Sequence, residues 1–554
     1  MNIEPGNISI SSGSVKYISN FADFEPLDDV TISIKKIEHH YIWTAYIQSL
    51  SVKKKITSGI NASHVVYDDG GNYISVNNQA YLLNGIQIRP DKIMEANSVS
   101  TEQQYAEYIE PLFQKSAELG YQTVIFPIHW KQIEKTQNTF NYTLLNRYYG
   151  YAEKYNLNIQ LLWFGSDVCG YNTNVPRYIL DDSSTYARLS SDADVLDYSD
   201  EDLIERECYA FQQLLTWLSK NDLDKRTIAI QLENEPNEKA YNGPSLDATS
   251  EQTYNSTSWC SGQKSEILNL IDRLGMLVKN GPYKCVTRVN LVTHNYLWSD
   301  VDRLKTLVEE VMALDGVDMV GYDTYQSDTS LRLLENSKNV EKNIAHWPEF
   351  GADGANYVPA MLLALANRAG IFGYQLKASE GDTAGAIIAA TDNTWTLPEG
   401  EKISDDKYRI DANELKAVNG VVNKAGSLIT LNDVNSTAVF NVERETNLSY
   451  ILPYSEKQSV GGISVTFKNS DAVGFGGCGY ATKVSDNEML VFATRGESSF
   501  SFENKTVASA ESGSYVNGVW NKESDITVKN SKITISSTLA YNDGEGTLIR
   551  VIFN

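Results

Sequence analysis

What this chain lacks excludes several classes of protein. None of its 554 residues belongs to a run of about 20 apolar residues, the length that spans a bilayer. The N-terminus also lacks the basic, apolar and small-residue succession of a signal peptide. We therefore expect a protein that is cytoplasmic, or one that is secreted and has already lost its signal peptide.

Positive charge is scarce. The chain has 47 Lys and Arg against 71 Asp and Glu, which gives a formal net charge of −24 at pH 7. Because such an acidic surface repels phosphate backbones and anionic lipid headgroups, we expect neither nucleic acid nor a membrane as a partner.

Cysteine and histidine are also few. The five cysteines are scattered and include no Cys-x-x-Cys pair, so the sequence predicts neither a disulfide framework nor a structural zinc site. The six histidines lack the His-x-His pairs or the His and Asp clusters of a metal-dependent barrel hydrolase. We expect no bound metal and no organic cofactor.

Aromatic residues, by contrast, are abundant, with 33 Tyr, 9 Trp and 16 Phe. Tyr and Trp match the flat apolar faces and rimming hydroxyls of sugars, because each combines a ring with a polar group. A large core explains the same composition equally well.

Hydrophobic periodicity divides the chain into three regions. Residues 1–79 are rich in β-branched and aromatic runs and predict an N-terminal β-domain. Over 80–395, eight short apolar runs alternate with amphipathic helical segments, and no Gly-x-Gly-x-x-Gly follows any of these runs. Beyond 395 the helical period disappears, and short strands predict a C-terminal β-sandwich region over 396–554. The fold class is therefore α/β, a (β/α)₈ TIM barrel with β-domains at both ends, and a doubly wound sheet is the competing fold.

The fourth and the seventh of the predicted barrel strands each end in a carboxylate. The fourth, 228–232, runs into Glu233-Asn234-Glu235, and the seventh, 344–347, runs into Pro348-Glu349. Active sites of such barrels form at the carboxyl ends of the strands. Hydrolysis of a glycosidic bond with retention requires a carboxylic acid and a nucleophilic carboxylate about 5 to 5.5 Å apart. We therefore expect Glu235 and Glu349 to face each other across the barrel mouth.

The same segments carry a family resemblance. The string Gln231-Leu232-Glu233-Asn234-Glu235 is similar to the Gln-x-Glu-Asn-Glu of glycoside hydrolase family 35 β-galactosidases. The likeness to families 35 and 42 covers about residues 80–380. Three further groups of segments contribute to it: 126–130, Glu134 and 140–142; 161–166 and 175–178; and Asp323-Thr324-Tyr325. Pro236 departs from the family 35 pattern and is commoner in endo-glucanase and mannanase relatives.

The resemblance implies a retaining barrel glycosidase with Glu235 as acid/base and Glu349 as nucleophile. It also implies that Asn234 holds the sugar 2-hydroxyl and that Tyr325 donates a hydrogen bond to the nucleophile. Arg89, just past the first strand, either holds the nucleophile ionised or is a surface arginine.

The sequence allows two interpretations for each of the other candidate site residues. Glu233 either contacts sugar hydroxyls or pairs with an ion inside the barrel. Four aromatic or imidazole side chains near strand ends either line sugar subsites or belong to the core: His129, Trp130, Trp163 and Trp347.

The sequence thus predicts an exo-acting retaining β-glycosidase, β-galactosidase-like, whose partner is an oligosaccharide or glycoside. An endo-acting β-glucanase or mannanase using the same two glutamates, or a non-catalytic carbohydrate-binding barrel, are the alternatives. Whether the chain forms a homo-oligomer is left open.

Overall fold

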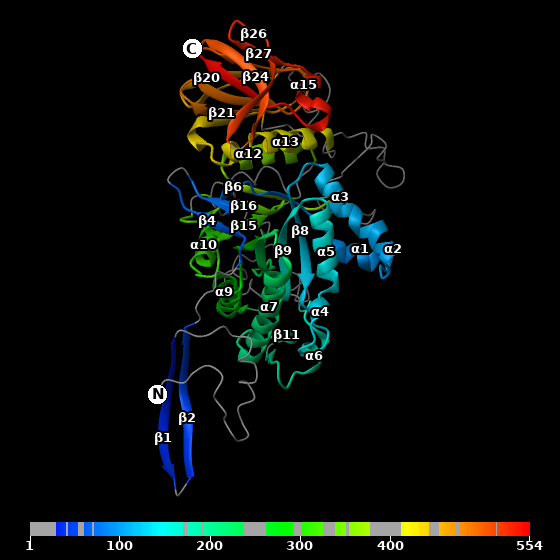
Figure 1. Ribbon diagram of the computed structural model, residues 1–554, viewed down its shortest axis with the longest axis vertical. Helices are drawn as coiled ribbons and strands as arrows, with labels where there is room; N and C mark the ends of the chain where they lie inside the picture. Colours follow the sequence, from blue (N-terminus) through cyan, green and yellow to red (C-terminus); the bar gives the residue numbers. More distant parts are fainter. Residues whose placement is uncertain are drawn as a thin grey trace. The chain divides into compact units, whose positions relative to one another are not determined.

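The computed structural model describes most of the chain in two compact units, 1–59 and 60–554 (Figure 1). The described residues are 29–39, 42–53, 60–68, 71–169, 172, 174–190, 192–237, 262–292, 301–324, 338, 340–350, 354–376, 412–441, 454–470, 477–516 and 518–554. The predicted N-terminal β-region, 1–79, extends over both units.

The first unit contains one antiparallel hairpin. Strands β1 (Asp29–His39) and β2 (Ile42–Lys53) pair along their whole length, with one register shift between Ser33 and Ile34. The β-branched runs that predict strands here fall within this hairpin.

The second unit is built around a barrel of eight parallel strands, which confirms the predicted fold class. The strands follow the order β15-β14-β12-β9-β8-β7-β17-β16, and a parallel bridge between Thr324 and Phe350 joins the two edges. In chain order they are β7 (Asn84–Gln87), β8 (Thr123–His129), β9 (Asn158–Val168), β12 (Thr227–Asn234), β14 (Val286–Val292), β15 (Met319–Asp323), β16 (His346–Phe350) and β17 (Gly370–Gly373). The fourth and seventh predicted strands are therefore β12 and β16.

Helices lie outside this ring of strands (Figure 1). The longest, α7 (Glu201–Asn221), begins where the Asp200 side chain accepts a hydrogen bond from the Asp202 backbone. Its apolar residues recur at intervals of three and four, and this face is buried against the barrel. The others are α1 (Pro90–Asn97), α2 (Glu102–Gln104), the π-helix η2 (Tyr105–Ile109), α3 (Glu110–Glu118), α4 (Trp130–Ile133), α5 (Thr143–Lys154), α6 (Arg177–Asp181), α9 (Lys264–Asn280), α10 (Val301–Met312) and α12 (Gly354–Ala366).

A small antiparallel sheet closes the amino-terminal end of the barrel. Ile74 and Val76 of β5 (Tyr73–Val76) are buried in one cluster with barrel residues such as Ile125 and Leu162. The other strands of this sheet are β4 (Ser63–Val66) and β6 (Gln79–Tyr81). Two further strand pairs are separate from it: β3 (Ile60–Asn61) with β13 (Tyr283–Lys284), and β10 (Arg188–Leu189) with β11 (Asp192–Leu196). With this end filled by apolar side chains, polar groups gather toward the other end.

Two antiparallel sheets form the C-terminal region. Their facing side chains, among them Phe440, Phe467 and Phe500, make a separate apolar core. One sheet contains β18 (Thr437–Phe440), β21 (Gly479–Ser485), β22 (Glu488–Ala493), β28 (Ile549–Phe553), β24 (Val507–Val516) and β25 (Val519–Asp525); the other contains β19 (Tyr454–Val460), β20 (Ile463–Asn469), β23 (Ser498–Phe502), β27 (Lys532–Ile535) and β26 (Val528–Lys529).

The expectation that helices end before residue 395 is wrong. Helix α13 (Ala412–Ala425) buries Leu415, Val418 and Val421 in the same core cluster as the barrel. Asn419 adds a buried link, since its Nδ2 donates to the Leu119 carbonyl at 2.8 Å and its Oδ1 accepts from Asn84 at 2.7 Å. Short helical pieces also occur at α14 (Ser427–Thr430), η5 (Val434–Ser436), α15 (Ser537–Tyr541) and η6 (Asn542–Gly544).

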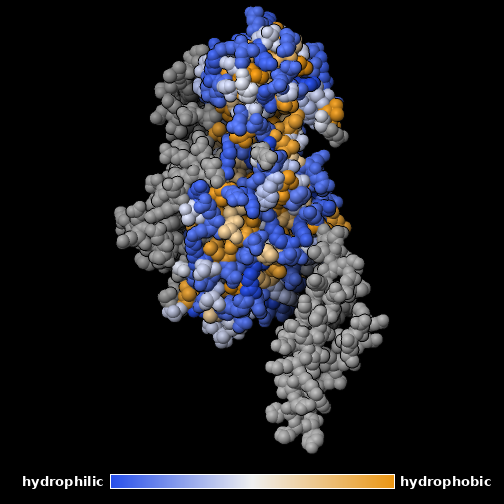
Figure 2. Space-filling model, turned by 90° about the vertical axis from the view of Figure 1, so that its left-hand side faces the viewer, coloured by the Kyte–Doolittle hydropathy of each residue, from blue (hydrophilic) through white to orange (hydrophobic). Residues whose placement is uncertain are grey.

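The surface agrees with the composition. Hydrophilic side chains predominate on the face in Figure 2, as expected for a net charge of −24. Among the described residues, no helix is both long and apolar enough to span a membrane.

Candidate active site

The end of β12 is bent so that the side chains of Glu233 and Glu235 point in different directions. Its register with β9 shifts between Leu232 and Asn234, and both Glu233 and Glu235 have left-handed backbones, with φ of 60° and 46°. Such conformations are unfavourable for residues with a Cβ and occur mostly where surrounding contacts impose them, often at functional sites. The bend takes Glu235 to the barrel mouth and leaves Glu233 inside.

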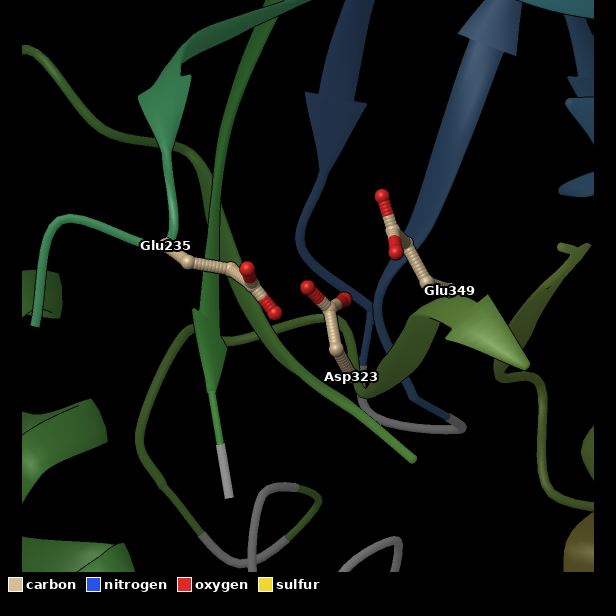
Figure 3. A group of neighbouring side chains, drawn as sticks. All are labelled: Glu235, Asp323 and Glu349. Atoms are coloured by element: carbon tan, nitrogen blue, oxygen red, sulfur yellow. The ribbon is translucent and has the colours of Figure 1, made fainter. Parts of the chain in front are cut away.

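Three carboxyl groups meet at this mouth. Glu235 follows β12, Asp323 ends β15 and Glu349 lies in β16, and one oxygen of each lies within 4.8 Å of the others (Figure 3). Asp323 lies between the two glutamates. The exposed fractions are only 9% for Glu235, 1% for Asp323 and 6% for Glu349. The structure thus brings together the two predicted glutamates and adds a third acid.

Polar contacts hold Glu235 from two sides. The Cys169 thiol donates to Glu235 Oε2 at 2.9 Å, and the Glu235 backbone N–H donates to Asn290 Oδ1 at 3.1 Å. The Asn290 amide also donates to Asn234 Oδ1 at 3.1 Å and to Asp323 Oδ2 at 2.7 Å. Asn290, in β14, therefore joins the ends of three neighbouring strands.

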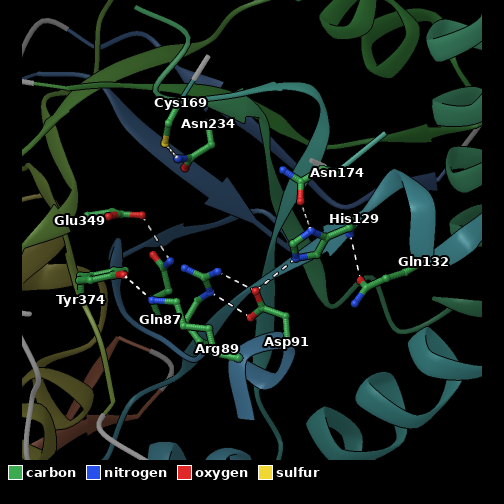
Figure 4. Close-up of polar contacts among 11 residues, drawn as sticks. Gln87, Arg89, Asp91, His129, Gln132, Cys169, Asn174, Asn234, Glu349 and Tyr374 are labelled. Atoms are coloured by element: carbon green, nitrogen blue, oxygen red, sulfur yellow. Dashed lines mark hydrogen bonds and ion pairs between the residues drawn. The ribbon is translucent and has the colours of Figure 1, made fainter. Parts of the chain in front are cut away.

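Glu349 lies near donors and positive charge. Gln87 Nε2, at the end of β7, donates to Glu349 Oε1 at 3.3 Å (Figure 4). The negative charge of Glu349 interacts with the positive charge of Arg89. Burial, followed by the charge of Glu349, raises the pKa of Tyr374. The Tyr374 hydroxyl accepts a hydrogen bond from Lys92 Nζ at 3.2 Å.

Arg89 is a half-buried partner in an ion pair and not an isolated surface arginine. Its guanidinium donates to both oxygens of Asp91, at 2.9 and 2.6 Å. Asp91 Oδ2 also contacts His129 Nε2 at 3.2 Å, and His129 Nδ1 contacts Asn174. Beside burial, the Arg89 charge is the strongest influence on Asp91 and holds the pKa of that carboxyl well below its usual range. These four residues form a polar chain that runs from beside Glu349 toward α4 (Figure 4).

Arg288 is a second cation, buried inside the barrel in β14. Its guanidinium lies 4.7 Å from the centre of the Phe372 ring, and its three nitrogens have no hydrogen-bond partner among the described residues. Burial lowers the pKa of Arg288 to about 10, so it remains a cation at neutral pH. Asp323 and Glu349 oppose that shift by their charge, which identifies Arg288 as an electrostatic neighbour of both.

The surroundings of Asp323 disfavour its ionised form. Burial raises its pKa well above the usual range, and the charges of Glu349 and Glu235 and a hydrogen bond with Glu235 raise it further. The bond from Asn290 acts in the opposite direction but is the smallest of these effects.

Glu233 lies away from this group and pairs with another acid. Its Oε2 accepts from the Asp167 backbone at 2.9 Å, and burial, followed by the charge of Glu207 and a hydrogen bond with it, raises the Glu233 pKa well above normal. Trp163 Nε1 donates to Glu207 at 2.9 Å, and the Ser166 hydroxyl donates to the other Glu207 oxygen. In the structure the neighbour of Glu233 around Gly165 is thus another acid, Glu207, and not the cation of an ion pair.

The three candidate tryptophans lie in the core. Trp130, Trp163 and Trp347 are no more than 1% exposed, so none has a ring face open to a sugar. Trp130 Nε1 donates to Glu134 at 2.9 Å, Trp163 packs on Phe211, and Trp347 packs on Phe350. Tyr325 lies outside the described residues.

The sequence analysis did not select several residues that the structure places at the mouth: Gln87, Asp91, Cys169, Asn290, Asp323 and Tyr374. Several of them end or follow a barrel strand, which is the one signal that marks them in the sequence.

Carboxylate oxygens are also the ligands that Mg²⁺ and Ca²⁺ prefer. Glu235, Asp323 and Glu349 are the one such acidic group among the described parts of the chain. The same three carboxyl groups are equally suited to acid–base chemistry.

Comparison with known proteins gives only distant likenesses. No protein-family profile matches the chain, and no curated protein matches it. The similar solved structures include an exo-β-1,4-mannosidase from Opitutaceae bacterium strain TAV5, which is 14% identical with a TM-score of 0.39 and aligns over 56% of this chain and 55% of that one. A GH30 endoxylanase from Clostridium papyrosolvens C71 is 14% identical with a TM-score of 0.39, over 86% and 97% of the two chains. A β-galactosidase from the psychrophilic Marinomonas ef1 is 8% identical with a TM-score of 0.39, over 55% of each chain.

The chain thus spans about half the length of the mannosidase and of the β-galactosidase. These identities and TM-scores are too low to indicate the function of this chain.

The packing around Glu233 gives a stability prediction. A Cβ at Gly165 would lie closer than 3.0 Å to Glu207, Glu233 and Trp163. Gly165→Ala should therefore lower the free energy of unfolding by about 2 kcal/mol or more, measured by urea denaturation. The matched control is Gly150→Ala on the exposed side of α5, where nothing lies within 4 Å, and it should stabilise by about 0.5 to 1 kcal/mol. Equal unfolding midpoints for the two variants would contradict the crowded acid pair.

Proposed function

We propose that this protein is a retaining β-glycosidase with Glu235 as acid/base and Glu349 as nucleophile. The observation that carries the proposal is the short distance between the two carboxyl groups, with one oxygen of each within 4.8 Å of the other. Retaining glycosidases separate these groups by about 5 to 5.5 Å, whereas inverting ones leave about 6.5 to 9.5 Å for a water molecule.

The surroundings suit each glutamate to its role. Glu349 must be ionised to attack the anomeric carbon, and the Gln87 donor and the nearby Arg89 and Arg288 charges favour its anion. Glu235 gives a proton to the leaving oxygen in the first step and takes one from water in the second. The Cys169 thiol donates to Glu235, and the buried Asp323 carboxyl lies within 4.8 Å of it.

The finer proposal is exo action on terminal β-galactosides. It is supported by the likeness of 231–235 to the family 35 string and by polar groups beside the nucleophile. Asn234 Nδ2 donates to Cys169 at 3.2 Å and has a second hydrogen for the sugar 2-hydroxyl. The chain of Arg89, Asp91 and His129 offers further donors and acceptors for sugar hydroxyls.

A panel of aryl β-glycosides tests the specificity directly. The aryl group should be released from the galactoside faster than from the glucoside, mannoside, fucoside, xyloside or arabinoside, and NMR should show the β-anomer as the first product. Release from none of them, with cleavage of β-glucan or mannan instead, would favour an endo-acting enzyme. An α-anomer as first product would rule out retention.

Removing the acid should affect substrates according to their leaving group. Because an activated aryl group departs without a proton, Glu235→Ala should reduce kcat/KM for alkyl glycosides by about 100-fold or more and for dinitrophenyl glycosides by less than about tenfold. The control, Glu153→Ala on the exposed side of α5, should change neither. Equal losses on both substrates would show that Glu235 is not the acid.

A further inference from the structure

A two-carboxylate mechanism leaves Asp323 without a role, although this residue lies between the two glutamates (Figure 3). It is 1% exposed, accepts a hydrogen bond from Asn290 at 2.7 Å and has an oxygen within 4.8 Å of an oxygen of each glutamate. Two ionised carboxylates are acceptors only and cannot bond to each other. A direct bond between Asp323 and Glu235 therefore requires a proton on one of them.

Charges on every neighbouring strand bear on this proton. Glu349 from β16 and Glu235 after β12 add negative charge, while Arg288 from β14 adds positive charge. The charge of Arg89 is paired with that of Asp91. Tyr374 has a raised pKa and is neutral, and the Cys169 thiol donates a hydrogen bond to Glu235, so neither adds charge. Three acids thus face one buried cation that has no carboxylate of its own, and full ionisation of all three is unfavourable.

We propose that Asp323 is a positioning residue that forms a carboxyl pair with Glu235, and that this pair holds the single proton used in both steps of the reaction. The inference rests on the proposed function, because it concerns the same acid/base. Burial and the neighbouring charges, which raise the pKa of Asp323, agree with it.

The proton balance closes over the two steps. In the first, the bond from Glu349 to the anomeric carbon forms, the glycosidic bond breaks, and the pair gives its proton through Glu235 to the leaving oxygen. The pair then carries two negative charges, but Glu349 has become a neutral ester. In the second, water attacks the anomeric carbon, the ester bond breaks, and the water proton returns to Glu235. The three acids therefore carry a net charge of about −2 in every resting state.

The variant Asp323→Asn tests this pair. An asparagine keeps the shape and can still donate to Glu235, but it takes no part in sharing a proton. Glu235 would then have one carboxyl group fewer beside it and would lose its proton more readily, so the basic limb of the kcat/KM profile for alkyl glycosides should move down by about one pH unit or more. A merely structural role would lower kcat/KM at every pH and leave the limb in place, which would overturn the proposal.

Infrared difference spectra provide a readout that does not depend on turnover. At neutral pH the wild-type protein should show a protonated carboxyl band of the pair, and both Asp323→Asn and Glu235→Gln should shift or remove it. The band of the separately buried Glu233 should stay unchanged in every variant. The control Glu503→Gln changes an exposed acid paired with Lys457 and should alter neither the spectrum nor the pH profile. If neither site variant alters the band, the pair is refuted. If the wild-type protein cleaves no glycoside but both variants alter the band, the pair stands and the proposed function fails.

Discussion

The constraint on which this site depends is the crowding of three buried acids at the barrel mouth. Two unit charges 4.8 Å apart repel each other by about 3 kcal/mol at an effective dielectric constant of about 20. Glu235, Asp323 and Glu349 tolerate this closeness because Asn290 and Gln87 donate hydrogen bonds and Arg288 supplies a buried positive charge. The same repulsion favours a shared proton and would be relieved when Glu349 becomes a neutral ester.

The barrel imposes the crowding through its backbone. Strands four, six and seven end at one rim, and the left-handed residues Glu233 and Glu235 separate two acids that an unbent strand would place on the same face. Glu233 pairs inside with Glu207 over Gly165, the position where a side chain does not fit. The opposite end is filled by β4–β6, so the polar groups of the interior gather at the mouth.

The eight strands and the meeting of Glu235 with Glu349 could be predicted, because short apolar runs alternate regularly with amphipathic segments and a glutamate follows both the fourth and the seventh run. The orientation of Trp163 and Trp347 could not be predicted, since a barrel strand is buried on both faces and its side chains give no alternation. The bidentate bond of Arg89 to Asp91 and the buried position of Arg288 likewise depend on tertiary contacts. Asp323 ends its strand just as Glu349 does, and only the distance between the strands shows that it joins the glutamates.

The most direct test of this account is to trap the covalent intermediate. A 2-deoxy-2-fluoro β-glycoside with an activated leaving group forms the ester but slows its hydrolysis, so the protein should gain the mass of one fluorosugar. Peptide mapping should then place that mass on Glu349. A label on Asp323, on Glu233 or on any other carboxylate would contradict the assignment of the nucleophile and, with it, the arrangement of charge around the mouth.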